Sequence, residues 1–466
     1  MSTRLAITRR QFVRLGAAGA VAVAASPVFG APAAGGGARP NILVVITDQQ
    51  HAATISARGC PHIHTPALDR LCARGVHFDH SYSAYPLCSP ARSAVFSSRM
   101  PSETGVYRNG RPIHPSIPNL GQWFRKQTDY ETVYTGKWHL PSSFTHNVPG
   151  FNVLTAGVGG QGNLGDASTS RACEAFLRNR TGTTPFLLVC SLFQPHDICQ
   201  WLRLNQVDPG TLRYPQLEPE LPPLPPNFEL RSPEPAIVAS RRDGNEPGVH
   251  KGKWSPLHWR YYMWAYYRHV EMVDAEFGRV LRALEETGLD QETLVIFTSD
   301  HGEGLAHHQM VRKNFLYDEA ARVPLIASWP GHLPGGTRDT RLVSGLDIVP
   351  TACHYAGVAP PQRALGTSLH TLFEDDAEAS RPFITAEVAD NRGRMIRTPR
   401  HKYVAYRDEP IEQLFDMQAD PGETKNLARS SGHASLLADH RRMLREWEPR
   451  LRPAPGVPHA EAWRKA

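Results

Sequence analysis

The sequence has few cysteines, and their spacing matches no familiar framework. Its seven cysteines include no Cys-x-x-Cys pair and no spacing typical of a structural zinc site. Six remain besides Cys88, enough for one or two disulfides in an oxidising compartment, although the pattern predicts no pairing. A chain of 466 residues, 41% of them hydrophobic, is therefore expected to rely on a large core, in one large domain or two unequal ones.

The main part of the chain also lacks a surplus of positive charge. The formal net charge is +6, but Arg4, Arg9, Arg10 and Arg14 are the only charged residues in 1–33, which leaves +2 for the remainder. A nucleic-acid-binding protein usually gathers a larger basic surplus into one patch. We therefore expect no nucleic-acid partner.

The apolar run near the N-terminus is too short and too weak to span a membrane. It covers Leu15–Ala25, follows the segment Thr8–Val13 with its two adjacent arginines, and precedes the small residues Ala31–Ala33. This order is typical of a twin-arginine export signal with a cleavage site. We predict that residues 1–33 are a signal peptide read by the twin-arginine translocase, and that the mature protein is periplasmic or secreted and soluble.

Four apolar runs predict strands whose carboxyl ends carry polar residues. Runs this rich in β-branched and aliphatic residues are typical of strands buried on both faces of a parallel sheet. In open α/β sheets ligands gather at that edge, so the polar residues are expected to converge on one site. The runs are Ile42–Thr47 before Asp48 and Gln49, Thr132–Thr135 before Lys137 and His139, Phe186–Cys190 before His196, and Leu294–Phe297 before Asp300 and His301.

The remaining pattern predicts two unequal parts. A long helix is expected over about 258–286, where apolar residues recur at three- and four-residue steps, and the proline-dense stretch 209–235 is expected to be a surface excursion. After Arg381, short alternating segments predict antiparallel strands, closed by a helix over about 433–451. We predict an α/β fold with a mostly parallel central sheet flanked by helices over residues 40–375. A smaller C-terminal α+β unit on an antiparallel sheet should follow over 376–466.

Cys88 stands at the predicted start of a helix. Pro90 suits a first helical turn, and the residues from Ala91 to Arg99 contain no helix breaker. The free N–H groups and the macrodipole at such a start favour an anion, and Arg92 adds a positive fork on the same face. From the residues alone, this arrangement suggests a thiolate nucleophile.

Asp48 and Asp300 are candidates for a shared cation site. They lie far apart in the chain, yet each directly follows a predicted buried strand. Carboxylate oxygens suit a hard ion such as calcium or magnesium, whereas an imidazole from His301 would be a less usual ligand for such an ion.

The segment Cys88–Arg92 resembles the Cys-x-Pro-x-Arg motif of the sulfatases. In that family the cysteine is oxidised to formylglycine, whose hydrate attacks sulfur. The resemblance extends from Asn41 to about Ala428, and includes a C-terminal motif in Leu414–Leu427. It implies an alkaline-phosphatase-like sandwich, hydrolysis of a sulfate ester, and maturation by a formylglycine-generating or anaerobic sulfatase-maturating enzyme.

The resemblance also implies a metal site with one divalent cation, calcium before magnesium. Asp48, Gln49, Asp300 and His301 match the family's metal ligands, and modified Cys88 would supply a further oxygen. Many members have aspartate where Gln49 stands and asparagine where His301 stands. The site in this sequence is therefore less negative than the usual pattern.

The same resemblance implies the catalytic residues. Arg92 would hold the formylglycine and the metal environment, and the positions that match sulfate-contacting and proton-transfer residues are Lys137, His139, His196 and Lys313. His196 is the expected acid for the leaving group, and His139 is expected to act in the second step.

Two other functions remain open beside the sulfatase hypothesis. Related enzymes use the same nucleophile and metal site as phosphonate monoester or phosphodiester hydrolases. If Cys88 stayed a thiol, the protein would instead be a non-catalytic sulfoglycan-binding protein. Among sulfate esters, a carbohydrate sulfate is favoured over sulfamate, aryl sulfate or choline sulfate, while the oligomeric state stays open.

Overall fold

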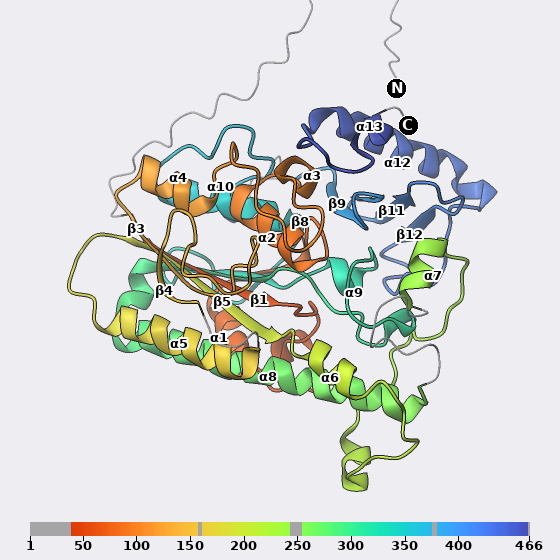
Figure 1. The fold of residues 1–466 in the computed structure, drawn as a ribbon, viewed down its shortest axis with the longest axis horizontal. Coiled ribbons are helices and arrows are strands. Elements are labelled where there is room, and N and C mark those ends of the chain that lie inside the picture. Colours follow the sequence, from red (N-terminus) through yellow and green to blue (C-terminus); the bar gives the residue numbers. More distant parts are fainter. Residues whose placement is uncertain (1–38, 157–160, 243–253, 375–379, 465–466) are drawn as a thin grey trace, which may run out of the picture.

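The computed structural model describes residues 39–156, 161–242, 254–374 and 380–464 (Figure 1). The predicted signal peptide lies outside these residues, as does most of the segment around the predicted boundary between 375 and 376. Among the helices of the described ranges, none has both the length and the apolarity needed to cross a bilayer.

The larger part of the chain is built on an eight-stranded sheet in the order β4-β3-β5-β1-β6-β7-β2-β8. Only β7 runs antiparallel to its neighbours in this sheet; the other pairings are parallel. This confirms the predicted mostly parallel sheet. The strands are β1 (Asn41–Asp48), β2 (Val76–Tyr82), β3 (Glu131–Gly136), β4 (Asn152–Thr155), β5 (Phe186–Pro195), β6 (Thr293–Ser299), β7 (Leu325–Ser328) and β8 (Thr337–Ser344).

Helices cover both faces of this sheet, so the central strands are buried on both sides (Figure 1). In β1, Ile42 and Val44 face one apolar core and Leu43 and Val45 face the other, all fully buried. Burying one such side chain contributes about 1.5–3 kcal/mol, so these strands form the stable centre of the fold. One face carries α2 (Cys88–Ser97), α4 (Leu120–Gln127) and α10 (Ile348–Tyr355), and the other carries α1 (Pro66–Arg74), α5 (Gly162–Arg178) and α8 (Pro256–Glu286).

The long helix α8 confirms the helix predicted from the three- and four-residue periodicity. It begins where the Ser255 side chain accepts a hydrogen bond from the His258 amide, with Pro256 in the first turn. Its buried stripe includes Tyr262, Val270 and Phe277. The aromatic residues of this stripe are therefore mainly core, as the periodicity favours.

A second, four-stranded antiparallel sheet lies toward the C-terminus, in the order β12-β11-β10-β9, as predicted (Figure 1). One face, with Met395 and Val404, packs against residues of the larger part such as Tyr82 and Phe315. The other face packs under α12 (Ala434–Trp447). The strands are β9 (Ile384–Val388), β10 (Gly393–Arg397), β11 (His401–Tyr406) and β12 (Gln413–Asp416).

The shorter helices lie at the edges and in the connections. They are α3 (Pro101–Thr104), α6 (Ile198–Leu204), α7 (Ala236–Arg242), α9 (Asp318–Ala321), α11 (His370–Phe373) and α13 (Ala460–Arg464). The predicted excursion at 209–235 holds only a short 3-10 helix, Pro215–Glu220. Strand β2 and the partly exposed edge strands β4 and β8 were not predicted, because their sequences lack a continuous apolar run.

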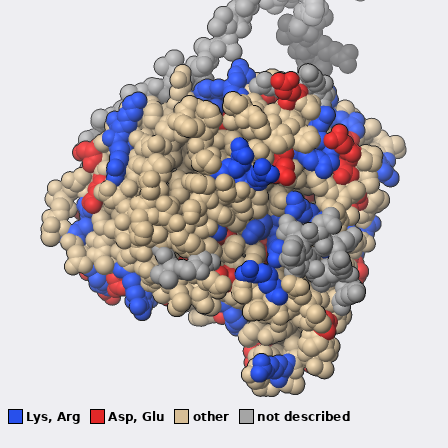
Figure 2. All heavy atoms as spheres, in the orientation of Figure 1, with Lys and Arg blue, Asp and Glu red and all other residues tan. Residues whose placement is uncertain are grey.

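The structure shows how charged side chains are spread over one face of the molecule and whether the cysteines are paired. On the face shown in Figure 2, Lys and Arg groups lie in several separate places among Asp and Glu groups. All seven cysteines lie in described residues and are free thiols, so the one or two disulfides considered possible are not formed.

Candidate active site

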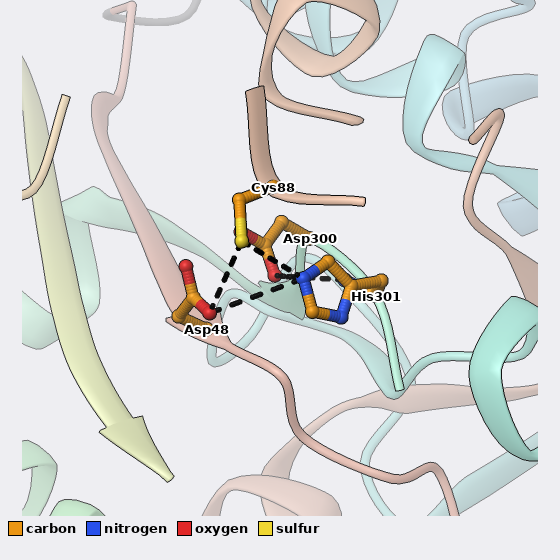
Figure 3. A group of neighbouring side chains, drawn as sticks. All are labelled: Asp48, Cys88, Asp300 and His301. Atoms are coloured by element: carbon orange, nitrogen blue, oxygen red, sulfur yellow. Dashed lines mark hydrogen bonds and ion pairs between the residues drawn. The ribbon is translucent and has the colours of Figure 1, made fainter. Parts of the chain in front are cut away.

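Four buried side chains converge at the carboxyl edge of the large sheet. One ligand atom from each of Asp48, Cys88, Asp300 and His301 lies within 4.8 Å of the others (Figure 3). Cys88 Sγ is 3.2 Å from His301 Nε2 and 3.8 Å from Asp48 Oδ1. All four are at most 1% exposed, so the cluster is a site for strong electrostatic interactions rather than a solvated surface group.

The register of two neighbouring strands produces this convergence. Strands β1 and β6 run parallel with Thr47 opposite Ser299, so Asp48 and Asp300 emerge side by side. The Asp300 amide donates to the Thr47 carbonyl at 3.1 Å. The chain then turns at Gln49, whose φ of 72° is in the left-handed region, and the Gln49 amide donates to Asp300 Oδ1 at 3.1 Å.

Cys88 is the first residue of α2, as the position of Pro90 predicted. The side chain of Ser89 donates to the His139 carbonyl at 2.7 Å, which ties the helix start to the loop after β3. Burial and Asp48 act to raise the pKa of the Cys88 thiol, but the charges of Lys313, Lys137 and His301 outweigh them and place it well below its ordinary value.

Arg92 is fully buried and holds the two carboxylates in place. Its Nε donates to Asp300 Oδ2 at 2.9 Å, and its Nη2 lies 3.4 Å from Asp48 Oδ2. Its Nη1 donates to the Lys137 carbonyl and to Ser191 Oγ, both at 2.8 Å. Burial opposes the charged form, but the two carboxylates outweigh it and raise the pKa of Arg92. Arg92 is therefore a structural cation beneath the site, with its donors used inside the protein.

Lys137 and Lys313 approach the cluster from different elements, and neither is a solvated surface lysine. Lys137 is 1% exposed and its ammonium group contacts Asp48 Oδ2. Lys313 is partly buried and donates to Gln49 Oε1. Both ammonium groups act to lower the pKa of the Cys88 thiol. The two charges give this edge of the sheet the capacity to bind an anion.

The two predicted proton-transfer histidines are partly buried near the same cluster. His139 has a φ of 63°, and burial lowers its pKa despite the nearby thiol of Cys88. Burial and the charge of Lys137 lower the pKa of His196 to about 4. All ten predicted site residues therefore lie at this edge of the sheet, while their individual roles stay predictions.

The structure adds residues that sequence reasoning missed. The side-chain nitrogen Nε2 of Gln49 donates to the carboxylate of Glu303. This carboxylate is fully buried and also accepts from the Tyr262 hydroxyl. Cys199 Sγ lies 3.4 Å from Gln49 Nε2 and 3.9 Å from Lys313 Nζ. Glu303 lies two residues after His301 in the sequence, so its position near the predicted site was a usable signal. Cys199 has no such signal in the sequence, because only the turn after β5 brings it to Gln49.

Comparison with known proteins decides the family. A family model described as Sulfatase matches residues 40–358, and one described as N-sulphoglucosamine sulphohydrolase, C-terminal, matches residues 306–449. The chain belongs to the sulfatase family. This confirms the resemblance read from Cys88–Arg92 and places the protein in the alkaline-phosphatase-like superfamily. The sulfatase is accordingly a sulfuric ester hydrolase.

Named relatives and solved structures agree with this assignment. The sulfatase is 32% identical over 436 residues to the Delta 4,5-hexuronate-2-O-sulfatase of Bacteroides thetaiotaomicron, covering 88% of this chain and 89% of that protein. A solved 2-O GAG sulfatase has a TM-score of 0.75 and 29% identity, covering 89% of this chain and 92% of its own. The phosphonate monoester hydrolase of Agrobacterium radiobacter shares the fold, with a TM-score of 0.73, 22% identity and coverage of 87% and 95%.

Members of the sulfatase family use a metal ion, and the residues present fit one. The cluster offers two carboxylates and an imidazole around a shared space, with Cys88 as the fourth member. Hard oxygen donors suit a divalent cation of the calcium or magnesium type. Gln49 Oε1 accepts from Lys313, and its predicted role as a metal ligand stays a prediction.

Proposed function

We propose that this sulfatase hydrolyses a carbohydrate sulfate ester, using formylglycine made from Cys88 and one divalent cation, calcium before magnesium. The observation that carries the proposal is the meeting of the α2 start with the ends of β1 and β6, with Lys137 and Lys313 beside it. The carbohydrate class is supported by the hexuronate sulfatase and the 2-O GAG sulfatase among the similar proteins.

Metal binding and sulfate binding are assigned to different residues of the site. The cation would be held by Asp48, Asp300 and His301, and together with the hydrated formylglycine it would supply charge neutralisation and a hydroxyl nucleophile for sulfur. Lys137 and Lys313 bind the sulfate oxygens, whose charge changes as the ester bond breaks.

Proton transfer is assigned to the two histidines of the proposed mechanism. As the bond between sulfur and the ester oxygen breaks, the leaving oxygen takes a proton from His196, whose protonated form the negative charge of a bound sulfate would favour. His139 is assigned the second step, in which it accepts the proton whose removal precedes the release of sulfate. Arg92 keeps the carboxylates oriented throughout, because its donors are bound to both of them.

Maturation and export complete the proposal. A formylglycine-generating enzyme or an anaerobic sulfatase-maturating enzyme would convert Cys88. The twin-arginine translocase would then carry the folded protein to the periplasm or beyond, because residues 1–33 have the order of an export signal.

A substrate panel tests the reaction class. We expect sulfate release from a sulfated sugar, with 2-O-sulfated unsaturated hexuronate disaccharides and 6-O-sulfated N-acetylglucosamine tested beside aryl sulfate, choline sulfate and N-sulfoglucosamine. A phosphonate monoester should react at least about 10²-fold more slowly in kcat/KM, because the site would stabilise the wrong transition-state charge for it. Ion chromatography measures the sulfate released from each ester. Cleavage of the phosphonate monoester faster than of every sulfate ester would identify the enzyme as a phosphonate monoester hydrolase instead.

The two lysines provide a second test. Lys137→Met and Lys313→Met keep the apolar stem and remove the charge, and each should lower kcat/KM on a good sulfate ester by about 10²-fold or more, the scale of one lost transition-state donor. The Kd of unreacted ester should change less, because charge on the bridging oxygen grows only as the bond breaks.

The matched control for the lysine test is Lys126→Met. Lys126 is exposed on α4 and should show changes within about a factor of two, typical of surface substitutions. Kinetics close to wild type in both active-site variants would remove the lysines from the mechanism.

A further inference from the structure

Glu303 is a buried carboxylate beside the catalytic cluster for which the proposed mechanism has no role. It lies two residues after His301, in the loop that follows β6, and is fully buried. Three donors converge on it: the Nε2 group of Gln49, the Tyr262 hydroxyl and the Arg312 amide. Buried acceptors need such donors, so the position of this carboxylate is well determined by its surroundings.

The Gln49 side chain lies between this carboxylate and the ammonium group of Lys313. Its Nε2 donates to Glu303, and its Oε1 accepts from Lys313. An amide has one donor end and one acceptor end, so a carboxylate on one side and an ammonium group on the other select a single orientation. Cys199 Sγ lies 3.4 Å from Nε2 and 3.5 Å from Oε1, and a thiol that can donate or accept does not select between the two.

Glu303 also fixes the main chain next to Lys313. Its carboxylate accepts from the Arg312 amide, and the amide of the following residue, Gly304, donates to the Arg312 carbonyl at 2.7 Å. Arg312 has a φ of 65°, in the left-handed region, which a residue other than glycine adopts only where its surroundings hold it. The bonds from Glu303 and Gly304 are what hold it there.

The residue after Lys313 ties the same loop to the start of α2. The Asn314 amide donates to the Pro86 carbonyl at 2.8 Å, two residues before Cys88 in the chain. A fixed main chain does not by itself fix the ammonium group, because a lysine carries it on a flexible four-carbon stem. The contact with Gln49 Oε1 restricts that remaining freedom.

We propose that Glu303 is a positioning residue for Lys313, acting through the Gln49 side chain and the Arg312 amide. Glu303 orients the acceptor that keeps the Lys313 ammonium group in place for the sulfate. This inference rests on the proposed function, in which Lys313 binds the sulfate oxygens. A donor stabilises a transition state most when its position is fixed before the reaction begins.

Glu303→Gln tests this role with a nearly isosteric change. The Tyr262 hydroxyl and the Arg312 amide both need an acceptor, so the new amide would keep its oxygen toward them and turn its NH₂ group toward Gln49. Two donors would then face each other, and Gln49 would rotate and present its own NH₂ group to Lys313. We expect kcat/KM on a good sulfate ester to fall about tenfold or more, mostly in kcat, as for a misplaced catalytic group.

Exchanging the two side chains should restore the arrangement. In the double variant Gln49→Glu with Glu303→Gln, the amide at 303 donates to the carboxylate at 49, whose other oxygen accepts from Lys313. Gln49→Glu alone places two carboxylates against each other in a buried site and should cost at least as much as Glu303→Gln. The exchange variant should recover kcat/KM to within about threefold of wild type, which a merely structural carboxylate would not produce.

A double-mutant cycle shows whether Glu303 acts through Lys313. In a Lys313→Met background, Glu303→Gln should lower kcat/KM by less than about twofold further, because the group that it positions is gone. The matched control is Glu387→Gln on β9, since Glu387 is also fully buried and accepts from the Ser102 amide at 2.8 Å and hydroxyl at 2.6 Å. It should lower the unfolding temperature and leave kcat/KM within about twofold.

Metal content is measured in the same preparations. Kinetics are recorded at a calcium concentration that saturates each variant, and elemental analysis checks that all carry the same amount, so that a lost cation does not imitate a displaced lysine. A Glu303→Gln protein that stays metal-free under these conditions would assign Glu303 to the metal site and overturn the inference. If Glu303→Gln does not fold, Tyr262→Phe removes one donor from Glu303 and carries the cycle, with an expected loss of about threefold.

The outcomes distinguish this inference from the proposed function. Kinetics close to wild type in Lys313→Met would contradict the sulfate contact of Lys313 itself. A large loss in Lys313→Met together with losses that multiply in the cycle, or with no recovery in the exchange variant, would leave the sulfatase mechanism standing and overturn the role of Glu303. Coupled losses with recovery support it.

Discussion

Replacing Cys88 with alanine is expected to reduce kcat for sulfate ester hydrolysis by about 10⁴-fold or more, the scale of losing a covalent nucleophile. Cys88 is the first residue of α2, 1% exposed, with Lys137, Lys313 and His301 acting on its charge. The alanine variant keeps the helix and these neighbours, so the loss would be one of chemistry rather than of fold. Steady-state kinetics and thermal unfolding on the same preparation separate the two.

The matched control is Cys72→Ala on α1, a buried thiol outside the site, which should keep its turnover. Mass spectrometry tests the modification itself. The peptide that contains Cys88 should be about 18 Da lighter in active wild-type protein, since formylglycine exchanges sulfur for oxygen and has two fewer hydrogens than cysteine. Full activity with an unmodified thiol would contradict the proposed nucleophile, and an unmodified, inactive protein that binds sulfated glycans would favour the binding function.

Replacing Asp300 with asparagine is expected to remove most of the bound divalent cation and to lower kcat/KM by about 10³-fold, because a metal in this position contributes several kcal/mol to the transition state. Asp300 is 1% exposed and lies in the cluster with Asp48 and His301. Elemental analysis of purified protein gives the metal content per chain. Chelation of the wild type should reproduce the loss, and calcium should restore more activity than magnesium.

Asp274→Asn is the control for this experiment. Asp274 is also buried, but its oxygens accept from the Ala67 and Leu68 amides at the start of α1, away from the cluster. It should lower the unfolding temperature while the metal content stays near wild type. Full turnover in a wild-type preparation shown to be metal-free would contradict the proposed site.

The environment of the site lysines depends on the tertiary structure and not on their local sequence. In the sequence, Lys137 resembles any lysine after a strand, and most such residues are solvated. In the structure its ammonium group contacts Asp48 and lies 4.2 Å from the centre of the Phe193 ring. That environment depends on β3 and β5 pairing in parallel, which no local pattern around Lys137 encodes.

The sequence by itself predicted the fold class and the residues that the structure brings together at the carboxyl edge of the sheet. Strands such as Ile42–Thr47 have continuous apolar character because both faces are buried, and this signal is local. The helix start at Cys88 is likewise local, since Pro90 and the helix formers that follow it act within one turn. The family motif in Cys88–Arg92 then added the chemistry that spacing alone could not predict.

Only the tertiary structure decided which partners these residues meet. The contacts of Glu303 and Cys199 with Gln49 arise between segments distant in the chain. The two side chains are an ordinary acid and an ordinary thiol, with no periodic pattern to mark them. Hydrogen bonding depends on distances of about 3 Å, and such distances are set by strand register and loop packing, which the spacing of residues along the chain does not specify.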